Sequence, residues 1–211
     1  MNESSFPRLL GDIGGTNARF AWQVSREAPL TVHASYACSA HPTLLDAIRQ
    51  FLEDHRLGRP AACAIGIANP VTGDEVRMTN HAWSFRISEL QRELGVERLE
   101  VLNDFTALAL SLPGLRSEQL IAIGSGQAAV GAPRAVIGPG TGLGVSGLIA
   151  ASNGREVAIA GEGGHVTMSA ADDDEAAILS RLRRHFGHVS AERVLSGPGL
   201  ENLYRAVAEE T

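Results

Sequence analysis

Residues 8–24 of the chain read RLLGDIGGTNARFAWQV. Residues 8–13 form a short apolar run that ends in glycines, and residues 18–24 form a second run typical of a strand. Glycine tolerates positive φ angles and lets other groups approach the backbone closely, so these glycines favour a turn. The stretch therefore predicts a β-hairpin with a glycine-rich turn.

The elements after this hairpin are those of an α/β domain. Residues 30–38 predict a third strand. The next segment predicts an amphipathic helix, because its apolar residues recur at spacings of three and four. Further strands and helices complete the first half of the chain: helix 42–55, strand 61–68, helix 87–94, strand 99–102 and helix 105–112.

The same order of elements begins again near residue 134. An apolar run at 135–137 leads into a second glycine turn at 138–144, which reads GPGTGLG. Strands at 145–150 and 156–160 and a helix at 173–186 follow. We interpret the repeat as an internal duplication, with coincidence as the alternative. The expected domains are residues 1–113 and residues 114–211.

Charge and composition exclude several classes of function. The chain has 211 residues and a formal net charge of −6, and all 18 of its Lys+Arg residues are arginine. Without lysine there is no Walker A loop, no kinase of the type that uses a lysine on its third strand, and no Schiff-base chemistry. Because the arginines are scattered, we expect neither nucleic acid nor a membrane surface as a partner.

The location of the protein is expected to be cytoplasmic. The N-terminus has no apolar core of a signal peptide, and the two cysteines, Cys38 and Cys63, are expected to be free thiols. Residues 135–154 carry no charge, but a proline and six glycines interrupt them. These breaks favour a glycine-rich hairpin over a membrane-spanning helix.

Both glycine turns are candidate phosphate-binding sites. Converging backbone N–H groups and a threonine hydroxyl can bind an anion, although each turn taken alone could be an ordinary hairpin turn. Asp12 would repel phosphate unless a divalent cation lay between them, and Mg²⁺ binds carboxylate and phosphate oxygens in this way. A strand follows the second turn, which argues against a Rossmann dinucleotide site. The candidate residues are Gly11, Asp12, Gly14, Gly15, Thr16 and Asn17 in the first turn, and Gly140, Thr141 and Gly142 in the second.

Polar residues that follow the strands are the second clue. Asn103 and Asp104 stand between a strand and a helix, where they either cap the helix or place a carboxylate at a ligand cleft. Such a carboxylate can accept a proton from a substrate hydroxyl. Glu162 and His165 lie on a glycine-rich loop and suit a hydroxyl-rich ligand such as a sugar, or are merely exposed. From spacing alone, Glu192 is expected to be a solvated acid in the first turn of a helix.

Other chemistries fit less well. The chain lacks the G-x-S-x-G nucleophile elbow of a Ser-His-Asp hydrolase and the additional cysteines of a zinc site. A glycosidase that uses two carboxylates, Asp104 and Glu162, stays open but leaves both glycine turns unexplained.

Six blocks together resemble the bacterial ATP-dependent glucokinase family. In chain order they are GDIGGTNA at 11–18, MTNHAW at 78–83, NDFT at 103–106, GTGLG at 140–144, GEGGHV at 161–166 and HVSAERVLSGPGL at 188–200. The resemblance implies the actin-like/hexokinase (ribonuclease H-like) ATPase fold, an α/β fold with two domains around a cleft. It also implies the substrates ATP and glucose, Mg²⁺, a role at the first step of glycolysis, and a homodimer in the full-length form.

The family resemblance implies a role for each matching residue. Asp104 is the expected general base on the 6-hydroxyl of the sugar. Asp12 is expected to serve Mg²⁺, and the two glycine turns are expected to bind the phosphates. The expected sugar ligands are Asn80, Asn103, Asp104, Glu162, His165 and Glu192.

The chain departs from the family at its end. Family members continue past Thr211, so this chain resembles their N-terminal two-thirds, with an incomplete second domain and an incomplete adenosine site. Two rival functions stay open: a non-catalytic sugar-binding module of the same fold, and an actin-like assembly protein that switches with ATP.

Overall fold

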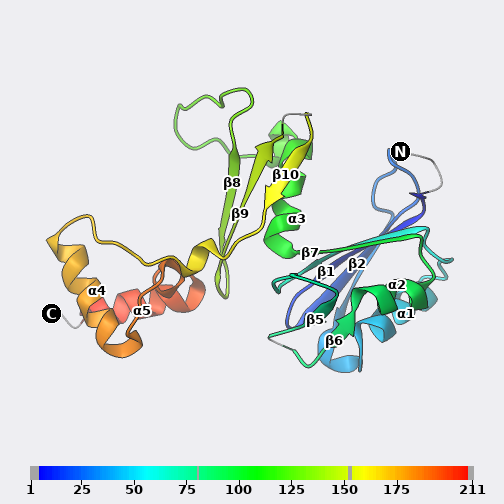
Figure 1. Ribbon diagram of the computed structural model, residues 1–211, viewed down its shortest axis with the longest axis horizontal. Coiled ribbons are helices and arrows are strands. Elements are labelled where there is room, and N and C mark those ends of the chain that lie inside the picture. The colour runs from blue at the N-terminus through cyan, green and yellow to red at the C-terminus, as the bar shows by residue number, and fades with distance from the viewer. Residues whose placement is uncertain (1–4, 80, 152–153, 209–211) are drawn as a thin grey trace. The chain divides into compact units, whose positions relative to one another are not determined.

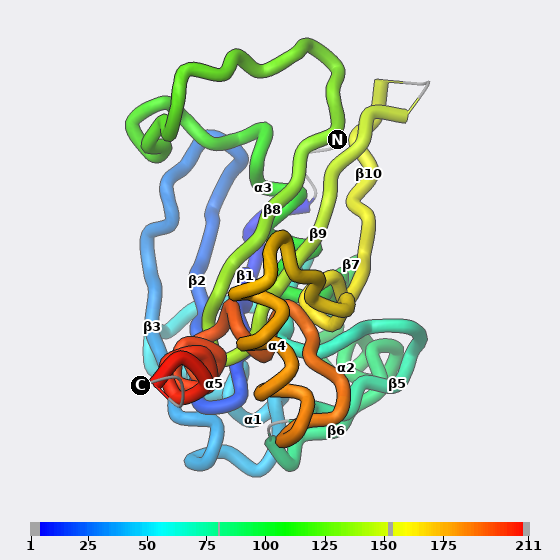
Figure 2. Tube along the Cα trace, turned by 90° about the vertical axis from the view of Figure 1, so that its left-hand side faces the viewer, coloured from blue at the N-terminus to red at the C-terminus, as the bar shows by residue number. Residues whose placement is uncertain are grey.

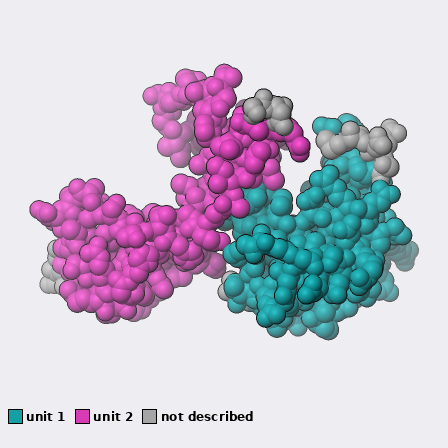
Figure 3. All heavy atoms as spheres, in the orientation of Figure 1, with its two compact units in different colours: residues 1–107 teal, residues 108–211 magenta. Residues whose placement is uncertain are grey.

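The structure, a computed structural model, describes residues 5–79, 81–151 and 154–208. It divides into two units, residues 1–107 and residues 108–211 (Figure 3). The division falls inside helix α3 (Asp104–Ser111), whereas the boundary expected from the sequence lies between Pro113 and Gly114, just beyond this helix.

The first unit is built on a five-stranded sheet with the strand order β3-β2-β1-β4-β7 (Figures 1 and 2). β1, β2 and β3 form an antiparallel meander, whereas β1 and β7 both pair with β4 in parallel. The strands are β1 (Arg8–Ile13), β2 (Asn17–Gln23), β3 (Val32–Ala37), β4 (Ala62–Ile67) and β7 (Arg98–Asn103). A small hairpin of β5 (Glu75–Arg77) and β6 (Ser84–Arg86) precedes α2 (Ile87–Leu94).

One face of this sheet packs into the core of the first unit. Leu9 and Ile13 of β1 are fully buried there, together with residues of α1 (Leu44–Asp54) and α2. The rings of Phe20 on β2 and Phe51 on α1 lie 5.5 Å apart. Local sequence sets the ends of both helices. The Thr43 hydroxyl accepts the Asp46 N–H at the start of α1, and Gly95 ends α2 with a left-handed φ of 64°.

The opposite face of the sheet carries polar groups. Since side chains alternate along a strand, Asp12, Arg19 and Gly66 point away from the core residues Leu9 and Ile13. A Cβ atom placed on Gly66 would lie 3.7 Å from the Cα atom of Asp104. The start of α3 therefore lies close to β4 at the carboxyl end of the parallel strands.

The second unit contains a three-stranded antiparallel sheet in the order β10-β9-β8 (Figure 1). Its strands are β8 (Arg134–Pro139), β9 (Leu143–Ala150) and β10 (Glu156–Ile159), and its longer helices are α4 (Asp173–Phe186) and α5 (Gly197–Ala208). Leu179 and Leu182 of α4 are buried in one cluster with Ala206 of α5. Across the described ranges, no helix combines the length and apolar character needed to cross a membrane.

The elements expected from the sequence are confirmed. β1, α2 and α4 have the predicted bounds, and the uncharged stretch after residue 134 forms the β8–β9 hairpin. The repeated order of strand, glycine turn and two strands is also present, as β1–β2–β3 and as β8–β9–β10.

The contact between α1 and the sheet yields a stability prediction. Replacing Phe51 by alanine removes a fully buried ring and leaves a cavity, so we expect the free energy of unfolding of the first unit to fall by about 3–5 kcal/mol. Urea denaturation followed by tryptophan fluorescence measures this unit alone, because both tryptophans of the chain, Trp22 and Trp83, lie in it.

The matched control is Glu53→Ala on the exposed face of the same helix. We expect it to change the free energy of unfolding by no more than about 0.5 kcal/mol. A loss of less than about 1 kcal/mol for Phe51→Ala would show that this ring does not hold α1 on the sheet.

Candidate active site

The first glycine turn joins β1 to β2 and is fixed by two hydrogen bonds from Cys38. The backbone N–H of Cys38 donates to the Thr16 carbonyl at 2.8 Å, and the Cys38 thiol donates to the Gly14 carbonyl at 3.4 Å. Within the turn, the Gly14 N–H donates to the Asn17 carbonyl at 2.9 Å. The acceptors in these bonds are the carbonyl oxygens of Gly14, Thr16 and Asn17. None of these bonds involves the N–H group of Gly15 or Thr16. The sequence analysis missed this role of Cys38.

Asp12, the acid of this turn, forms an ion pair with Arg19. Arg19 Nη1 lies 2.9 Å from Asp12 Oδ2, and both side chains are about 60% exposed. An exposed pair contributes little to stability, but the arginine sets the local charge around the carboxylate. Arg19 was not among the predicted residues. The hairpin register would have found it, because residues 12 and 19 are direct cross-strand partners.

Asn103 and Asp104 occupy the junction between β7 and α3. Asn103 Oδ1 accepts the backbone N–H groups of Phe105 and Thr106, so Asn103 caps the helix. Asp104 Oδ1 accepts the Phe105 N–H at 2.8 Å and the Asn103 side-chain amide at 2.9 Å. All of these bonds to Asp104 reach the same oxygen, Oδ1. The expected helix cap is therefore Asn103, while Asp104 Oδ2 takes no part in these bonds.

The environment of Asp104 raises the pKa of its carboxyl group above the ordinary value. Burial is the largest cause, and the negative charge of Asp12 adds to it, while the Phe105 N–H acts in the opposite direction. The parallel pairing explains why Asp12 acts on Asp104, because β1, β4 and β7 end at the same edge. A carboxylate with a raised pKa is suited to general-base chemistry.

The second glycine turn lies between β8 and β9 in the second unit. The Gly140 N–H donates to the Gly142 carbonyl at 2.8 Å, which closes the turn. The Gly140 carbonyl accepts the N–H of Gly197, the first residue of α5, also at 2.8 Å. The turn is therefore attached to a segment more than fifty residues further along the chain.

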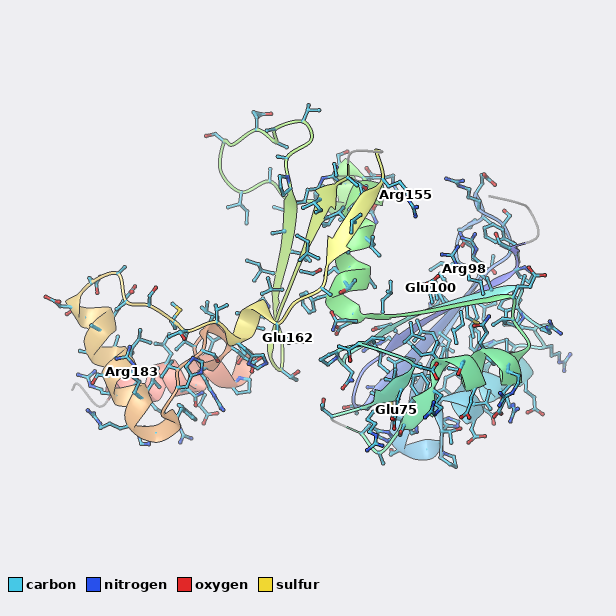
Figure 4. The ribbon with its side chains drawn as sticks, in the orientation of Figure 1. Glu75, Arg98, Glu100, Arg155, Glu162 and Arg183 are labelled. Carbon is cyan, nitrogen blue, oxygen red and sulfur yellow. The ribbon has the colours of Figure 1, made fainter. Side chains whose placement is uncertain are left out.

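Glu162 and His165 project from the loop that follows β10 (Figure 4 labels Glu162). Glu162 Oε2 and His165 Nε2 are 3.9 Å apart, and both side chains are more than half exposed. The short 3₁₀ turn η5 (Gly163–His165) sets their spacing, and the His165 N–H donates to the Glu162 carbonyl at 3.0 Å. A Cβ atom on Gly164 would overlap the carbonyl oxygen of Leu143, so glycine is required at this position.

Glu192 joins the same part of the second unit. Residues 166–168 run antiparallel to residues 189–191, because the Ala191 N–H donates to the Val166 carbonyl and the Met168 N–H to the Val189 carbonyl. This pairing brings η6 (Ala191–Arg193) to the loop of Glu162. The half-buried Glu192 carboxylate accepts the Leu143 N–H at 2.9 Å. The expectation of a solvated acid, drawn from spacing alone, was wrong.

The structure places the predicted site residues in two groups. In the first unit, it brings Asp12, Asn103 and Asp104 together at one sheet edge beside the turn of Gly14–Asn17. In the second unit, it brings the turn of Gly140–Gly142 together with Glu162, His165 and Glu192 around Leu143. Asn80 lies outside the described residues.

Asp12 in the first glycine turn is the candidate residue for binding a metal ion. Among the residues that the structure describes, no three His, Cys, Asp or Glu side chains are arranged to hold a metal ion. Asp12 offers one exposed carboxylate, which fits Mg²⁺, since this ion keeps several waters and takes its other ligands from substrate phosphates.

Comparisons with known proteins relate the chain to one family. The family model described as Glucokinase matches residues 9–211. A glucokinase of Aromatoleum aromaticum is 53% identical over 206 residues, which are 97% of this chain and 62% of that protein. The crystal structure of a glucokinase from an Antarctic psychrotroph has a TM-score of 0.87 at 36% identity and covers 97% of this chain and 65% of that one.

A more distant solved structure shows the fold alone. The hexokinase of Schistosoma mansoni, in complex with glucose, has a TM-score of 0.55 at 17% identity. The expected actin-like ATPase fold is confirmed. The chain spans 62% of the Aromatoleum protein and therefore corresponds to its N-terminal part.

The proximity of Asp12 and Asp104 yields a prediction about titration. Replacing Asp12 by asparagine removes a negative charge that disfavours ionisation of Asp104, so the pKa of Asp104 should fall toward its ordinary value. Carbon-detected NMR titration of the Asp104 carboxyl group measures this shift directly.

Glu100→Gln is the control, because Glu100 lies on β7 but is paired with Arg98 at 2.9 Å (Figure 4). This change should leave the Asp104 pKa where it is in the parent. If Asp12→Asn raised the Asp104 pKa or left it unchanged, the proposed interaction between the two acids would be disproved.

Proposed function

The chain belongs to the glucokinase family, and from that premise we propose that it supplies the catalytic base, sugar ligands and phosphate-binding turns of a glucokinase. The reaction transfers the γ-phosphoryl group of ATP to the 6-hydroxyl of glucose. The observation that carries the proposal is the half-buried Asp104, whose pKa is raised at the edge of the sheet where the first glycine turn begins. The resemblance read from the sequence is confirmed at the level of the family.

Asp104 acts as the general base. Its Oδ1 is engaged by Phe105 and Asn103, so we assign Oδ2 to the proton of the sugar hydroxyl. As this proton moves to Oδ2, the sugar oxygen forms a bond to the γ-phosphorus, and the bond from that phosphorus to the bridging oxygen breaks, which releases ADP. Phosphoryl transfer needs positioning and charge stabilisation more than covalent chemistry from the protein.

The sugar ligands are groups that can exchange hydrogen bonds with hydroxyls. Glu162 and His165 are exposed and 3.9 Å apart, which suits neighbouring hydroxyls of one ring. Asn103 uses its Oδ1 for the helix cap and one amide N–H for Asp104, so its second N–H stays for the sugar. Asn80 and Glu192 complete the proposed set on the family resemblance.

The two glycine turns are the proposed phosphate sites. In the first turn, Cys38 donates hydrogen bonds to the carbonyl oxygens of Gly14 and Thr16 and so fixes the backbone of the turn. This supports the proposal that the N–H groups of Gly15 and Thr16 donate to a phosphate oxygen. Mg²⁺, bound through Asp12 and water, would neutralise charge on the ATP phosphates.

Location and assembly are two further parts of the proposal. Cys38 and Cys63 are both buried free thiols, which supports a reducing compartment and hence the cytoplasm. A homodimer of the full-length form is proposed on the family resemblance.

The main test replaces the base. Asp104→Asn should lower the turnover number for glucose phosphorylation by about 10²–10⁴-fold, because general-base assistance is lost. Glucose binding, measured by calorimetry, should survive within several-fold, since Asn103, Glu162 and His165 remain. Turnover is measured in a coupled assay with the purified protein in its full natural length.

Asp174→Asn, an exposed acid in the first turn of α4, is the matched control and should leave turnover unchanged. Turnover of Asp104→Asn within a few-fold of the parent would show that Asp104 is not the base. Glucose binding by the parent without any ATP turnover would instead support the sugar-binding module.

A second test concerns the metal. Asp12→Asn should raise the Mg²⁺ concentration that gives half-maximal turnover by about tenfold, because a carboxylate that helps to hold the ion is lost. Titrating Mg²⁺ at saturating glucose and ATP measures this concentration. The assignment of Asp12 to the metal is excluded if the variant and the parent need the same Mg²⁺ concentration.

A further inference from the structure

A single backbone amide links the second glycine turn to Glu192. Leu143 directly follows the turn, and its N–H donates to Glu192 Oε2 at 2.9 Å across 49 residues of sequence. A hydrogen bond to an ionised carboxylate is stronger than one between neutral groups. Because Glu192 is half-buried, water competes less for this bond than it would at an open surface.

The carboxylate also packs directly on the turn. A Cβ atom placed on Gly142 would lie 2.5 Å from Glu192 Oε2 and 3.3 Å from its carboxyl carbon, which is too close for an alanine without movement. On the other side of the turn, the Gly197 N–H donates to the Gly140 carbonyl at 2.8 Å. The segment from Glu192 to Gly197 therefore holds the turn at both of its ends.

The hydrogen bonds from Leu143 to Glu192 and from Gly197 to Gly140 restrict the backbone conformations of the turn between them. Glycine has more accessible backbone conformations than any other residue, so a turn with glycines at positions 140 and 142 loses much entropy when it is fixed. A turn that is already fixed binds an anion without this cost at the moment of binding.

We propose that Glu192 is a positioning residue for the glycine turn of residues 140–142, beyond the sugar contact that the family resemblance assigns to it. Oε2 holds the Leu143 N–H and thereby sets the turn, while Oε1 stays available for a sugar hydroxyl. One side chain then serves both the sugar ligands and the phosphate-binding turn. The proposal rests on the proposed function for the identity of the anion, which is the phosphate chain of ATP.

The first measurement is the hydrogen–deuterium exchange rate of the Leu143 amide. Glu192→Ala removes the acceptor, so this amide should exchange about tenfold faster than in the parent. Glu192→Gln keeps a side-chain oxygen at the same place and should stay within about threefold of the parent. Two matched controls, Glu162→Ala in the sugar loop and Glu201→Ala on α5, should leave the rate unchanged.

The second measurement is the affinity for inorganic triphosphate with Mg²⁺, taken by calorimetry without sugar. Glu192→Ala should weaken this affinity about tenfold, whereas Glu192→Gln should weaken it much less. Glu162→Ala should weaken binding of glucose but not of triphosphate. Gly142→Ala should act like Glu192→Ala, because the added methyl group displaces the carboxylate.

The outcomes separate the two proposals. An unchanged Leu143 exchange rate in Glu192→Ala would overturn the positioning role, whatever the ligands do. A loss of glucose affinity alone, with triphosphate affinity preserved in Glu192→Ala, would also overturn it and leave Glu192 as a sugar ligand only. If the parent binds neither glucose nor triphosphate, the proposed function fails, and the exchange rate still decides whether Glu192 holds the turn.

Discussion

The chemistry of the first unit depends on parallel pairing of three strands. Because β1, β4 and β7 run in the same direction, their carboxyl ends meet at one edge, and two acids from distant parts of the sequence come under each other's influence. Burial makes ionisation of Asp104 less favourable, and the charge of Asp12 adds to this effect. Arg19, paired with Asp12 across the hairpin, limits the negative charge at the same edge. The raised pKa of the Asp104 carboxyl group thus depends on burial and on a neighbour, Asp12, that only the sheet topology brings close.

The second unit is organised around one backbone position. Both backbone polar groups of Leu143 are in contact with other segments: Gly164 packs on its carbonyl, and Glu192 accepts its N–H. The loop that carries Glu162 and His165 and the turn of Gly140–Gly142 are therefore fixed to the same residue. Such shared support matters because binding groups need their neighbours to hold them in place.

The sequence predicted most of the helices and strands. It did not predict helix α5, the β5–β6 hairpin or the contacts that support the candidate site residues. The glycine turns, the Asn103-Asp104 pair and the helix of residues 173–186 were readable because local chemistry determines them. Glu192 was misread from spacing alone, since its partner, Leu143, lies 49 residues away and only the fold brings them together. The same holds for Cys38 beneath the first turn. By contrast, the pairing of Arg19 with Asp12 could have been predicted, because the length of a hairpin turn fixes which residues face each other across the strands.

If Asp104 accepts the proton of the sugar hydroxyl, as proposed, the turnover number should depend on pH through this carboxyl group. A base must be ionised to act, so turnover should fall as the pH drops through the raised pKa of Asp104. This acid limb should be absent from the residual activity of Asp104→Asn. An identical acid limb in the parent and in that variant would contradict the account, because the titrating group would then be another residue.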